Sequence, residues 1–256
     1  MNPFSDPLFI PVVVYSLMIG AAAFLLFALP YSLLSSLDPP AARKYRIQQK
    51  QLTASRVFWP ALHRFAINMA VVFAVAAACW PLLRLTGIHD GLAPAWYEVL
   101  WQIAAFLVID DFLYYWVHRA LHTRWLYKHV HSVHHRVPAP WAISGGDFHP
   151  VEYLLLTATA LAGPILLGAH VATLWAWLAF RQWEAAEGHS GYAFPWNPTR
   201  WLPGYQGPAF HDFHHSRFVG NYANFFSHLD RWCGTLAPGF PESPESSRQT
   251  GEHERR

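Results

Sequence analysis

Four long apolar stretches, at residues 8–37, 65–85, 95–117 and 151–181, constrain the fold of this chain more than any other feature. Each is long enough to cross a hydrocarbon core of about 30 Å as a helix. A bilayer offers no water to backbone N–H and C=O groups, so a spanning segment satisfies them within a helix. Hydrophobic residues make up 53% of the chain and charged residues only 13%, about half the share of a typical soluble domain. The expected fold class is therefore all-α, an integral membrane helical bundle.

Basic residues mark the loops that are expected to stay in the cytoplasm. The loops at residues 38–64 and 118–150 both contain several Lys and Arg, whereas the loop around His89 contains none. Positively charged loops are retained on the cytoplasmic side of a membrane. The two basic loops are therefore predicted to lie in the cytoplasm, and the His89 loop on the opposite side.

The fourth stretch is predicted to form a re-entrant hairpin over residues 151–181. A single crossing would separate the histidines that follow this stretch from those that precede it. We therefore expect a bend near Gly163 and Pro164. Arms of about 15 residues reach only about 22 Å at 1.5 Å per residue, so the hairpin is expected to insert partially.

Residues 1–236 are predicted to form a single membrane domain. The polar and aromatic segments 118–150 and 182–236 would form a cytoplasmic, histidine-rich cap on the apolar helices. Residues 237–256 are rich in Pro, Ser, Glu and Arg, and we predict a disordered tail there.

The chain contains 16 histidines, and half of them fall in three short motifs. Residues three or four positions apart share a helix face, with Cβ atoms about 5–6 Å apart, so the histidines of one motif can point at one centre. An isolated histidine is more often a surface or core residue, but three such motifs indicate metal binding. The motifs comprise His118 and His122; His131, His134 and His135; and His211, His214 and His215.

Eight imidazoles exceed the needs of one metal ion, because structural zinc takes four ligands and catalytic zinc usually three. The motifs therefore predict a di-metal cap with open coordination positions. Imidazole binds zinc, copper, iron and nickel, so the ligand type leaves the metal open. The Glu-x-x-His motif of soluble di-iron proteins is absent from the sequence. A transporter would place metal ligands near the membrane midplane, whereas these motifs follow the apolar stretches, which favours catalysis.

Two aspartates are the main candidates to support the metal ligands. Asp111 lies in the third apolar stretch, two helical turns before His118, and is predicted to fix the tautomer of a ligand histidine; a structural pair with Arg or Tyr is the alternative. Asp212 lies inside the third motif, where it either supports a histidine or faces solvent. Glu152 and Glu184 are weaker candidates.

These motifs, in this order, resemble the fatty acid hydroxylase and sterol desaturase superfamily, and most closely its 4-methylsterol monooxygenases. The resemblance extends over about residues 109–235. One departure is Phe210, which stands where relatives often carry another histidine before the third motif. Beyond the three motifs, the matching stretches include His149-Pro150-x-Glu152, His189-Ser190-Gly191-Tyr192, Gly220-Asn221-Tyr222-Ala223, and the pairs Asp230-Arg231 and Gly234-Thr235.

The resemblance implies two iron ions as the cofactor, with zinc as the alternative after purification, and O2 as co-substrate. It adds His189 and His149 to the candidate metal ligands. It places the protein in a bacterial inner membrane or the endoplasmic reticulum, with a cytoplasmic active site. The implied activity is hydroxylation of an unactivated C–H bond of a sterol or related lipid. The alternatives are a lipid desaturase, a fatty-acid or carotenoid hydroxylase, and a non-enzymatic membrane protein that binds or transports metal.

Electrons are expected to come from a separate protein, because the sequence has no Gly-x-Gly-x-x-Gly dinucleotide motif. A ferredoxin, or a haem protein with an NAD(P)H reductase, would serve. A net charge of +2 without a basic run gives no indication of a nucleic-acid partner. Basic residues of the cap are predicted to dock an acidic donor, with positive-inside bias as the alternative explanation; they are Arg119, Arg124, Lys128, Arg136 and Arg217.

Overall fold

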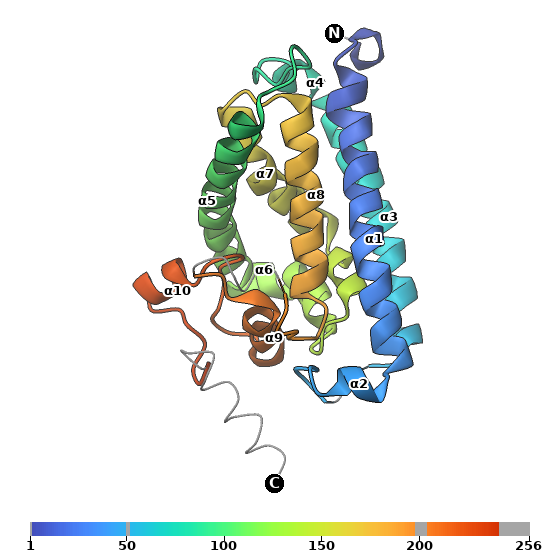
Figure 1. Ribbon diagram of the computed structural model, residues 1–256, viewed down its shortest axis with the longest axis vertical. Coiled ribbons are helices and arrows are strands. Elements are labelled where there is room, and N and C mark those ends of the chain that lie inside the picture. Colours follow the sequence, from blue (N-terminus) through green and yellow to red (C-terminus); the bar gives the residue numbers. More distant parts are fainter. Residues whose placement is uncertain (1, 50–51, 198–203, 241–256) are drawn as a thin grey trace.

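The computed structural model describes residues 2–49, 52–197 and 204–240. Within this part of the chain the protein is helical and has no strands, and its long helices run roughly along one axis as a bundle (Figure 1). This arrangement confirms the predicted all-α bundle. The long helices are α1 (Ser16–Leu37), α3 (Ala54–Ala78), α5 (Trp96–Leu121), α7 (Pro150–Leu166) and α8 (Val171–Gly188).

Short elements connect the long helices and cover one end of the bundle. The N-terminus and α4 lie at one end of the long axis, and α2, α6 and α9 lie at the other (Figure 1). A π-helical segment, Ile10–Tyr15, leads directly into α1. The other short elements are η1 (Pro3–Ser5), α2 (Pro40–Arg43), α4 (Trp80–Leu83), α6 (Arg124–His129), η3 (His131–Arg136), η4 (Ala142–Gly146), α9 (Gly207–Arg217) and α10 (His228–Trp232).

Three helical segments of the described chain are long and apolar enough to cross a membrane: Ile10–Leu37, Ala54–Ala78 and Trp96–Leu121. They correspond to the first three predicted stretches. The second begins at Ala54 rather than at residue 65, because the helix continues through the polar segment that contains Arg56 and Arg64.

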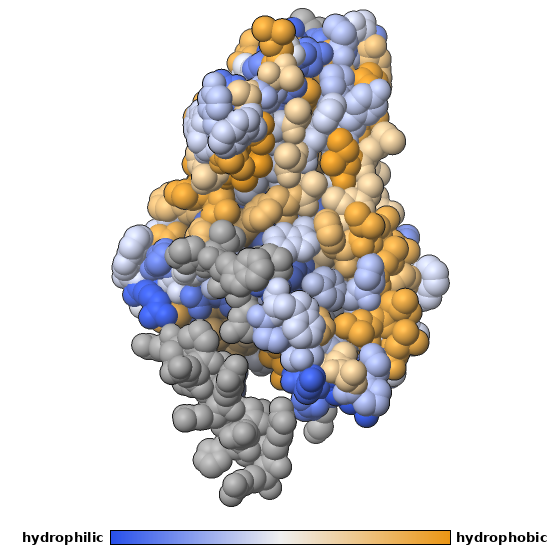
Figure 2. Space-filling model, in the orientation of Figure 1, coloured by the Kyte–Doolittle hydropathy of each residue, from blue (hydrophilic) through white to orange (hydrophobic). Residues whose placement is uncertain are grey.

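The flank of the bundle exposes apolar side chains that a soluble protein would bury (Figure 2). Leu26 and Leu33 on α1 and Val108 and Phe112 on α5 are each more than half exposed. Extended exposed apolar surface marks a contact with lipid or with another protein. On helices of membrane-spanning length, the surrounding hydrocarbon accounts for this surface.

α7 and α8 form the hairpin that the fourth apolar stretch predicts, but the position of the bend was predicted wrongly. Pro164 lies inside α7, and the chain turns after Leu166. The turn uses Gly168, whose φ of +54° is costly for residues with a Cβ. Gly168, four positions after Pro164, therefore sets the bend.

The arms of the hairpin are slightly longer than the predicted 15 residues, and its partial insertion stays a prediction. Its turn lies beside the loop that joins α4 to α5, where the His89 N–H donates to the Ala169 oxygen (3.3 Å) and the Val171 N–H donates to the His89 oxygen (2.9 Å). The arms of 17 and 18 residues reach about 25–27 Å at 1.5 Å per residue. The hairpin therefore returns the chain to the end of the bundle where α9 lies (Figure 1).

The beginning of the predicted disordered tail is ordered and packs on the cap. Ala237 is buried, and its N–H donates to the Asn221 Oδ1 (2.8 Å). The Phe240 ring lies edge-on to Phe210, with ring centroids 5.2 Å apart. These contacts correct the prediction for residues 237–240, and residues 241–256 lie outside the described part of the chain.

α7 lies close against α5 at Gly163. A Cβ at this position would lie 2.9 Å from the Phe106 Cα and 2.7 Å from its Cδ1. Phe106 is itself fully buried and lies edge-on to Trp177 of α8, with ring centroids 5.9 Å apart. The absence of a side chain at Gly163 therefore sets the spacing of α5 and α7.

We predict that Gly163→Ala lowers the stability of the protein by about 1–3 kcal/mol, because the added methyl group must push α5 away from α7. Thermal unfolding of the detergent-solubilised protein measures the effect. Gly20→Ala is the matched control, since a Cβ there would find its nearest neighbour at 3.9 Å. Equal stability of the two variants would contradict the close approach.

Candidate metal centre

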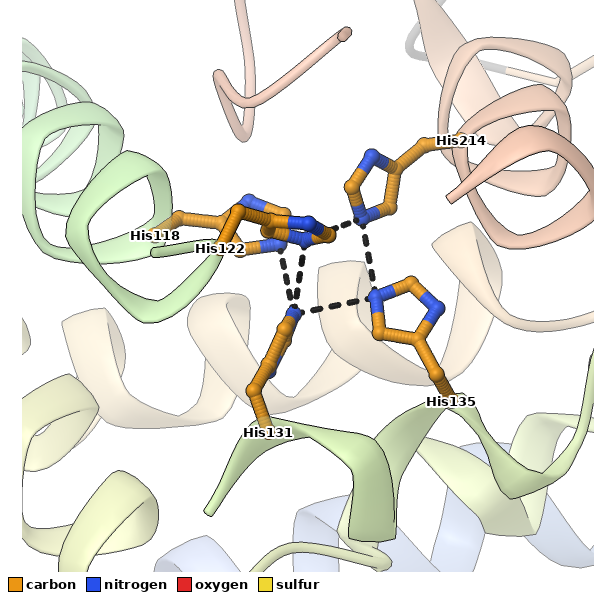
Figure 3. A group of neighbouring side chains, drawn as sticks. All are labelled: His118, His122, His131, His135 and His214. Carbon is orange, nitrogen blue, oxygen red and sulfur yellow. Dashed lines mark hydrogen bonds between the residues drawn. The ribbon is translucent and has the colours of Figure 1, made fainter. Parts of the chain in front are cut away.

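Nine histidines of the described chain converge at the α9 end of the bundle in two adjoining groups. Within each group, one nitrogen from every member lies within 4.8 Å of the others. Figure 3 shows the first group, in which rings from α5, η3 and α9 point toward one centre. The first imidazole group comprises His118, His122, His131, His135 and His214, and the second imidazole group comprises His134, His189, His211 and His215.

Each His-x-x-His-His motif contributes to both groups. In η3, the outer residues His131 and His135 join the first imidazole group and His134 joins the second. In α9 the assignment is reversed, because His214 joins the first group and the two outer histidines join the second. In each motif the last two histidines are adjacent in the sequence, and their side chains leave the backbone in different directions. Consecutive histidines therefore serve two neighbouring centres.

Hydrogen bonds at Nδ1 fix the tautomers of several of these rings. His118 Nδ1 donates to the Tyr222 carbonyl (2.8 Å), and His214 Nδ1 donates to the Gly220 carbonyl (2.6 Å). In the second group, His189 Nδ1 donates to its own helix at Ala185 O (2.8 Å). A carbonyl oxygen only accepts, so each Nδ1 carries the proton and each Nε2 of a neutral ring keeps a lone pair.

These lone pairs point at one another at close range. The Nε2 atoms of His118 and His131 are 3.2 Å apart, and those of His189 and His211 are 2.9 Å apart. His118 and His189 have no proton on Nε2, so lone pairs crowd each centre where a cation is absent. Two nitrogens bound to one metal at about 2.1 Å and at right angles would be about 3.0 Å apart. The donor set and its spacing therefore fit two metal ions.

Burial keeps the imidazoles neutral. Desolvation lowers the pKa of His189 and of His214 to about 4. The pKa of His122 falls to about 2, first through desolvation and then through the neighbouring His214. Metal binding requires the unprotonated ring nitrogen, so this environment leaves the lone pairs available near pH 7.

Glu152 takes the supporting role that was predicted for Asp111. Its Oε1 lies 2.6 Å from His131 Nδ1, and both residues are about 1% exposed. Asp111 contacts no histidine of either group; its Oδ1 accepts the N–H groups of Phe225 (2.7 Å) and Phe226 (3.3 Å). The Asp111 carboxylate, which we predicted to bind a ligand histidine, thus binds the backbone at residues 225 and 226 instead. In this way Asp111 orders the segment whose Tyr222 carbonyl accepts a hydrogen bond from His118.

Asp212 is buried in the cap but also contacts no histidine of the two groups. Its Oδ1 accepts a hydrogen bond from Gln48 Nε2 (2.8 Å), which ties the segment after α2 to α9. Desolvation raises the pKa of Asp212 to about 7. Asp212 therefore does not support a ligand histidine as predicted, and instead it joins two parts of the cap.

The two histidines added by the resemblance have different positions. His189 at the end of α8 joins the second group. His149 lies outside both groups and caps α7, where its Nδ1 accepts the Val151 N–H (3.2 Å). Each stands alone in the sequence, so spacing gave no signal for either.

Sequence reasoning did not assign the carbonyls that orient the rings. Gly220 has a φ of +75°, and a Cβ there would lie 2.6 Å from the Ala237 backbone. Only glycine fits this turn, which directs the Gly220 carbonyl at His214. In the sequence, the Gly220-Asn221 pair indicates a turn, but it does not indicate that the Gly220 carbonyl binds His214.

An apolar cavity inside the bundle ends at the second imidazole group. Along α8 its wall runs from Leu174 to His189, about 22 Å at 1.5 Å per residue. Val12 and Ile88 line the far end, and His189 and His211 line the near end. The described lining contains no member of the first group. A long apolar ligand in this cavity would therefore meet only the second metal position.

A helical membrane bundle with two histidine groups that fit metal ions, at the end of an apolar cavity, indicates the class of membrane oxidoreductases that act on lipids. The comparison with known families agrees: residues 103–235 match the family described as "Fatty acid hydroxylase". The chain belongs to this family and is an oxygen-dependent oxidoreductase. No solved structure matches the chain.

Curated relatives cover most of the chain and most of their own length. "Methylsterol monooxygenase 2-2" of Arabidopsis thaliana is 37% identical over 228 residues, which are 86% of this chain and 84% of the relative. "Methylsterol monooxygenase 2-1" of the same plant is 35% identical, with 86% of each chain covered. "Very-long-chain aldehyde decarbonylase GL1-11" of Oryza sativa subsp. indica is 41% identical over 196 residues, 75% of this chain and 74% of the relative. The relatives that resemble this chain thus include both methylsterol monooxygenases and an aldehyde decarbonylase.

We predict that His134→Ala removes most of the bound metal and leaves the protein inserted in the membrane, because the second imidazole group loses one of its four nitrogens. His149→Ala is the control and should retain its metal, since His149 lies outside both groups. Metal analysis of anaerobically purified protein measures both. Full metal content in the His134 variant would remove that residue from the site.

Glu152→Gln is expected to weaken metal binding by about 10–100-fold, because a neutral amide replaces the charged carboxylate that accepts the hydrogen bond from His131 Nδ1. Asp111→Asn should leave metal affinity nearly unchanged, since its oxygen can still accept from Phe225. Competition with a chelator measures the two affinities. A similar loss in both variants would show that Glu152 has no special link to the site.

Proposed function

We propose that this protein is a membrane-bound di-iron monooxygenase that hydroxylates an unactivated C–H bond of a sterol or related lipid. The observation that carries the proposal is the cavity, which leads an apolar ligand about 22 Å through the bundle to His189 and His211. The methylsterol monooxygenases among the relatives support a sterol as the substrate class.

The reaction balances when O2 and two external electrons enter together with two protons. One oxygen atom enters the C–H bond as a hydroxyl group, and the other leaves as water. Iron held by the two imidazole groups would supply the activation of O2. The chain itself binds the lipid, excludes water with apolar side chains, and directs the reacting carbon toward His189 and His211.

The donor set supports iron and a division of roles between the two groups. Imidazole nitrogens suit iron, although zinc competes for the same ligands during purification. The first imidazole group offers five nitrogens and the second offers four. The second position therefore keeps more room for ligands from outside the chain, and it is the one that faces the cavity.

A separate protein is proposed to supply the electrons, either a ferredoxin or a haem protein with an NAD(P)H reductase. Three of the five basic residues predicted to dock it have partners within the chain. Arg119 Nη1 donates to the Tyr115 hydroxyl (3.1 Å), Arg136 pairs with Asp147, and the Arg217 guanidinium lies over the Phe213 ring (5.3 Å to its centroid). The side chains of Arg124, Lys128 and Arg217 are exposed on the cap. These three residues form the basic face that we propose for an acidic donor.

The proposed location is a bacterial inner membrane or the endoplasmic reticulum, with the centre on the cytoplasmic side. α2, with Arg43 at its end, lies at the same end of the bundle as α9 with its histidines (Figure 1). The positive-inside rule assigns such an end to the cytoplasm.

A second candidate function is oxidative removal of a carbon from a long-chain aldehyde, which the 41% identity to an aldehyde decarbonylase favours. Desaturation and fatty-acid or carotenoid hydroxylation would use the same centre. Metal transport is disfavoured, because the histidines gather at one end of the bundle instead of along its middle.

Turnover under ¹⁸O2 separates these activities. We predict a sterol product that is heavier by one labelled oxygen atom, formed by the reconstituted protein with a reduced donor and detected by mass spectrometry. A product that lacks two hydrogens would indicate a desaturase, and a shortened chain would indicate the decarbonylase reaction. Metal movement across vesicles without oxygen consumption would contradict the proposal.

A further inference from the structure

The cavity wall changes character at its end near the metal centre. Most of its lining is aliphatic, but charged and amide side chains gather beside His189 and His211. They are Arg181, Gln182 and Glu184 of α8 and Asn224 of the cap. Burying such groups is costly unless they have partners, so this polar end calls for an explanation.

One carboxylate oxygen of Glu184 accepts hydrogen bonds from the described part of the chain, and the other accepts none. Its Oε2 accepts from Arg181 Nη1 (3.0 Å) and from Asn224 Nδ2 (3.2 Å). Its Oε1 accepts no hydrogen bond from the described part of the chain. A Cβ on Gly188 would lie 3.6 Å from this Oε1, and Gly188 lines the same cavity. The free oxygen thus lies beside Gly188, the residue before His189, and the absence of a side chain at Gly188 leaves space next to it.

The charges at this end disfavour an anionic head group. The Arg181 guanidinium lies between two carboxylates, with Nε 2.5 Å from Asp110 Oδ2 and Nη1 3.0 Å from Glu184 Oε2. Asp110 Oδ1 is buried and makes no hydrogen bond within the described part of the chain. One positive charge against two negative charges leaves no surplus cation for the carboxylate of a free fatty acid.

We propose that Glu184 is a specificity-determining residue that selects a neutral lipid alcohol, by accepting a hydrogen bond from the ligand hydroxyl at Oε1. Arg181 and Asn224 both donate to Oε2, which leaves Oε1 as the acceptor atom beside the cavity. A carboxylate only accepts, so it binds a hydroxyl but has no hydrogen to offer an aldehyde, a ketone or an ether.

This inference rests on the proposed function, and it specifies where the hydroxyl lies. With its polar group at Glu184 and its apolar body directed toward Val12 and Ile88, a ligand places carbons near its hydroxyl beside His189 and His211. The selected substrate is therefore an alcohol oxidised close to its own hydroxyl. The same logic favours an alcohol over the aldehyde of the second candidate function.

Equilibrium binding to the protein in lipid nanodiscs tests the selection without turnover. The probes are 4,4-dimethylcholestan-3β-ol, its 3-O-methyl ether and its 3-ketone, with 1-octadecanol against octadecanoate as a second pair. A hydrogen bond to a charged group corresponds to about tenfold or more in affinity. We expect each alcohol to bind at least about tenfold more tightly than its matched partners. Equal or tighter binding of the ether, ketone or carboxylate would overturn the proposal.

Two variants assign the preference to Glu184. Glu184→Gln removes the charge, and Gly188→Ala covers Oε1 with a methyl group at an ordinary contact distance of 3.6 Å. Both should reduce the alcohol preference to within about threefold and retain their metal. A preference unchanged in both would overturn the assignment. Glu187→Gln is the matched control, because this carboxylate binds the Tyr205 hydroxyl and Asn197 and does not line the cavity.

The binding experiments and the activity assay can refute the role of Glu184 and the proposed function independently of each other. An enzyme that hydroxylates sterols but binds ether and alcohol equally would refute the role of Glu184 and leave the proposed function standing. A protein that prefers alcohols but inserts no labelled oxygen would refute the proposed function and leave the role of Glu184 standing. The ligand series on the unmodified protein decides the question even where a variant fails to fold.

Discussion

The structure depends on lone pairs that face one another. Nine imidazoles present ring nitrogens to two small volumes, and hydrogen bonds at Nδ1 hold several of those nitrogens unprotonated. Such crowding is unfavourable without a cation and favourable with one. Much of the cap serves this arrangement: the Tyr222 and Gly220 carbonyls orient two rings, Glu152 orients His131, and Asp111 orders the loop that carries Tyr222.

The bundle places that centre at a boundary between two environments. On one side, the second imidazole group closes an apolar cavity that runs along α8 between helices of membrane-spanning length. On the other side, the first imidazole group lies in a polar cap with exposed basic residues. In the proposed function, the lipid would approach the second imidazole group from the membrane, and the electron donor would approach the cap. The hairpin of α7 and α8 makes this possible, because it returns the chain to the end from which it started.

Buried charge inside the bundle separates two tasks that residues near a metal can perform. Glu152 contacts a ring nitrogen of His131, so it tunes the metal centre. Glu184 contacts no imidazole; Arg181 and Asn224 hold one of its oxygens and leave the other free beside the cavity. The first carboxylate acts on the cofactor site and the second on the ligand.

The sequence by itself determined the membrane helices, the metal-binding motifs and the prediction of two metal ions, because apolar length and His spacing are local properties of the chain. His189 needed the resemblance as well, since a single histidine has no spacing to measure. The tertiary structure decided which histidine joins which group, that His149 caps α7, and that Glu152 rather than Asp111 supports a ring. It also moved the hairpin bend to Gly168. These outcomes depend on which distant segment arrives beside a side chain, as Phe225 does beside Asp111, and such contacts follow from packing and leave no trace in local sequence.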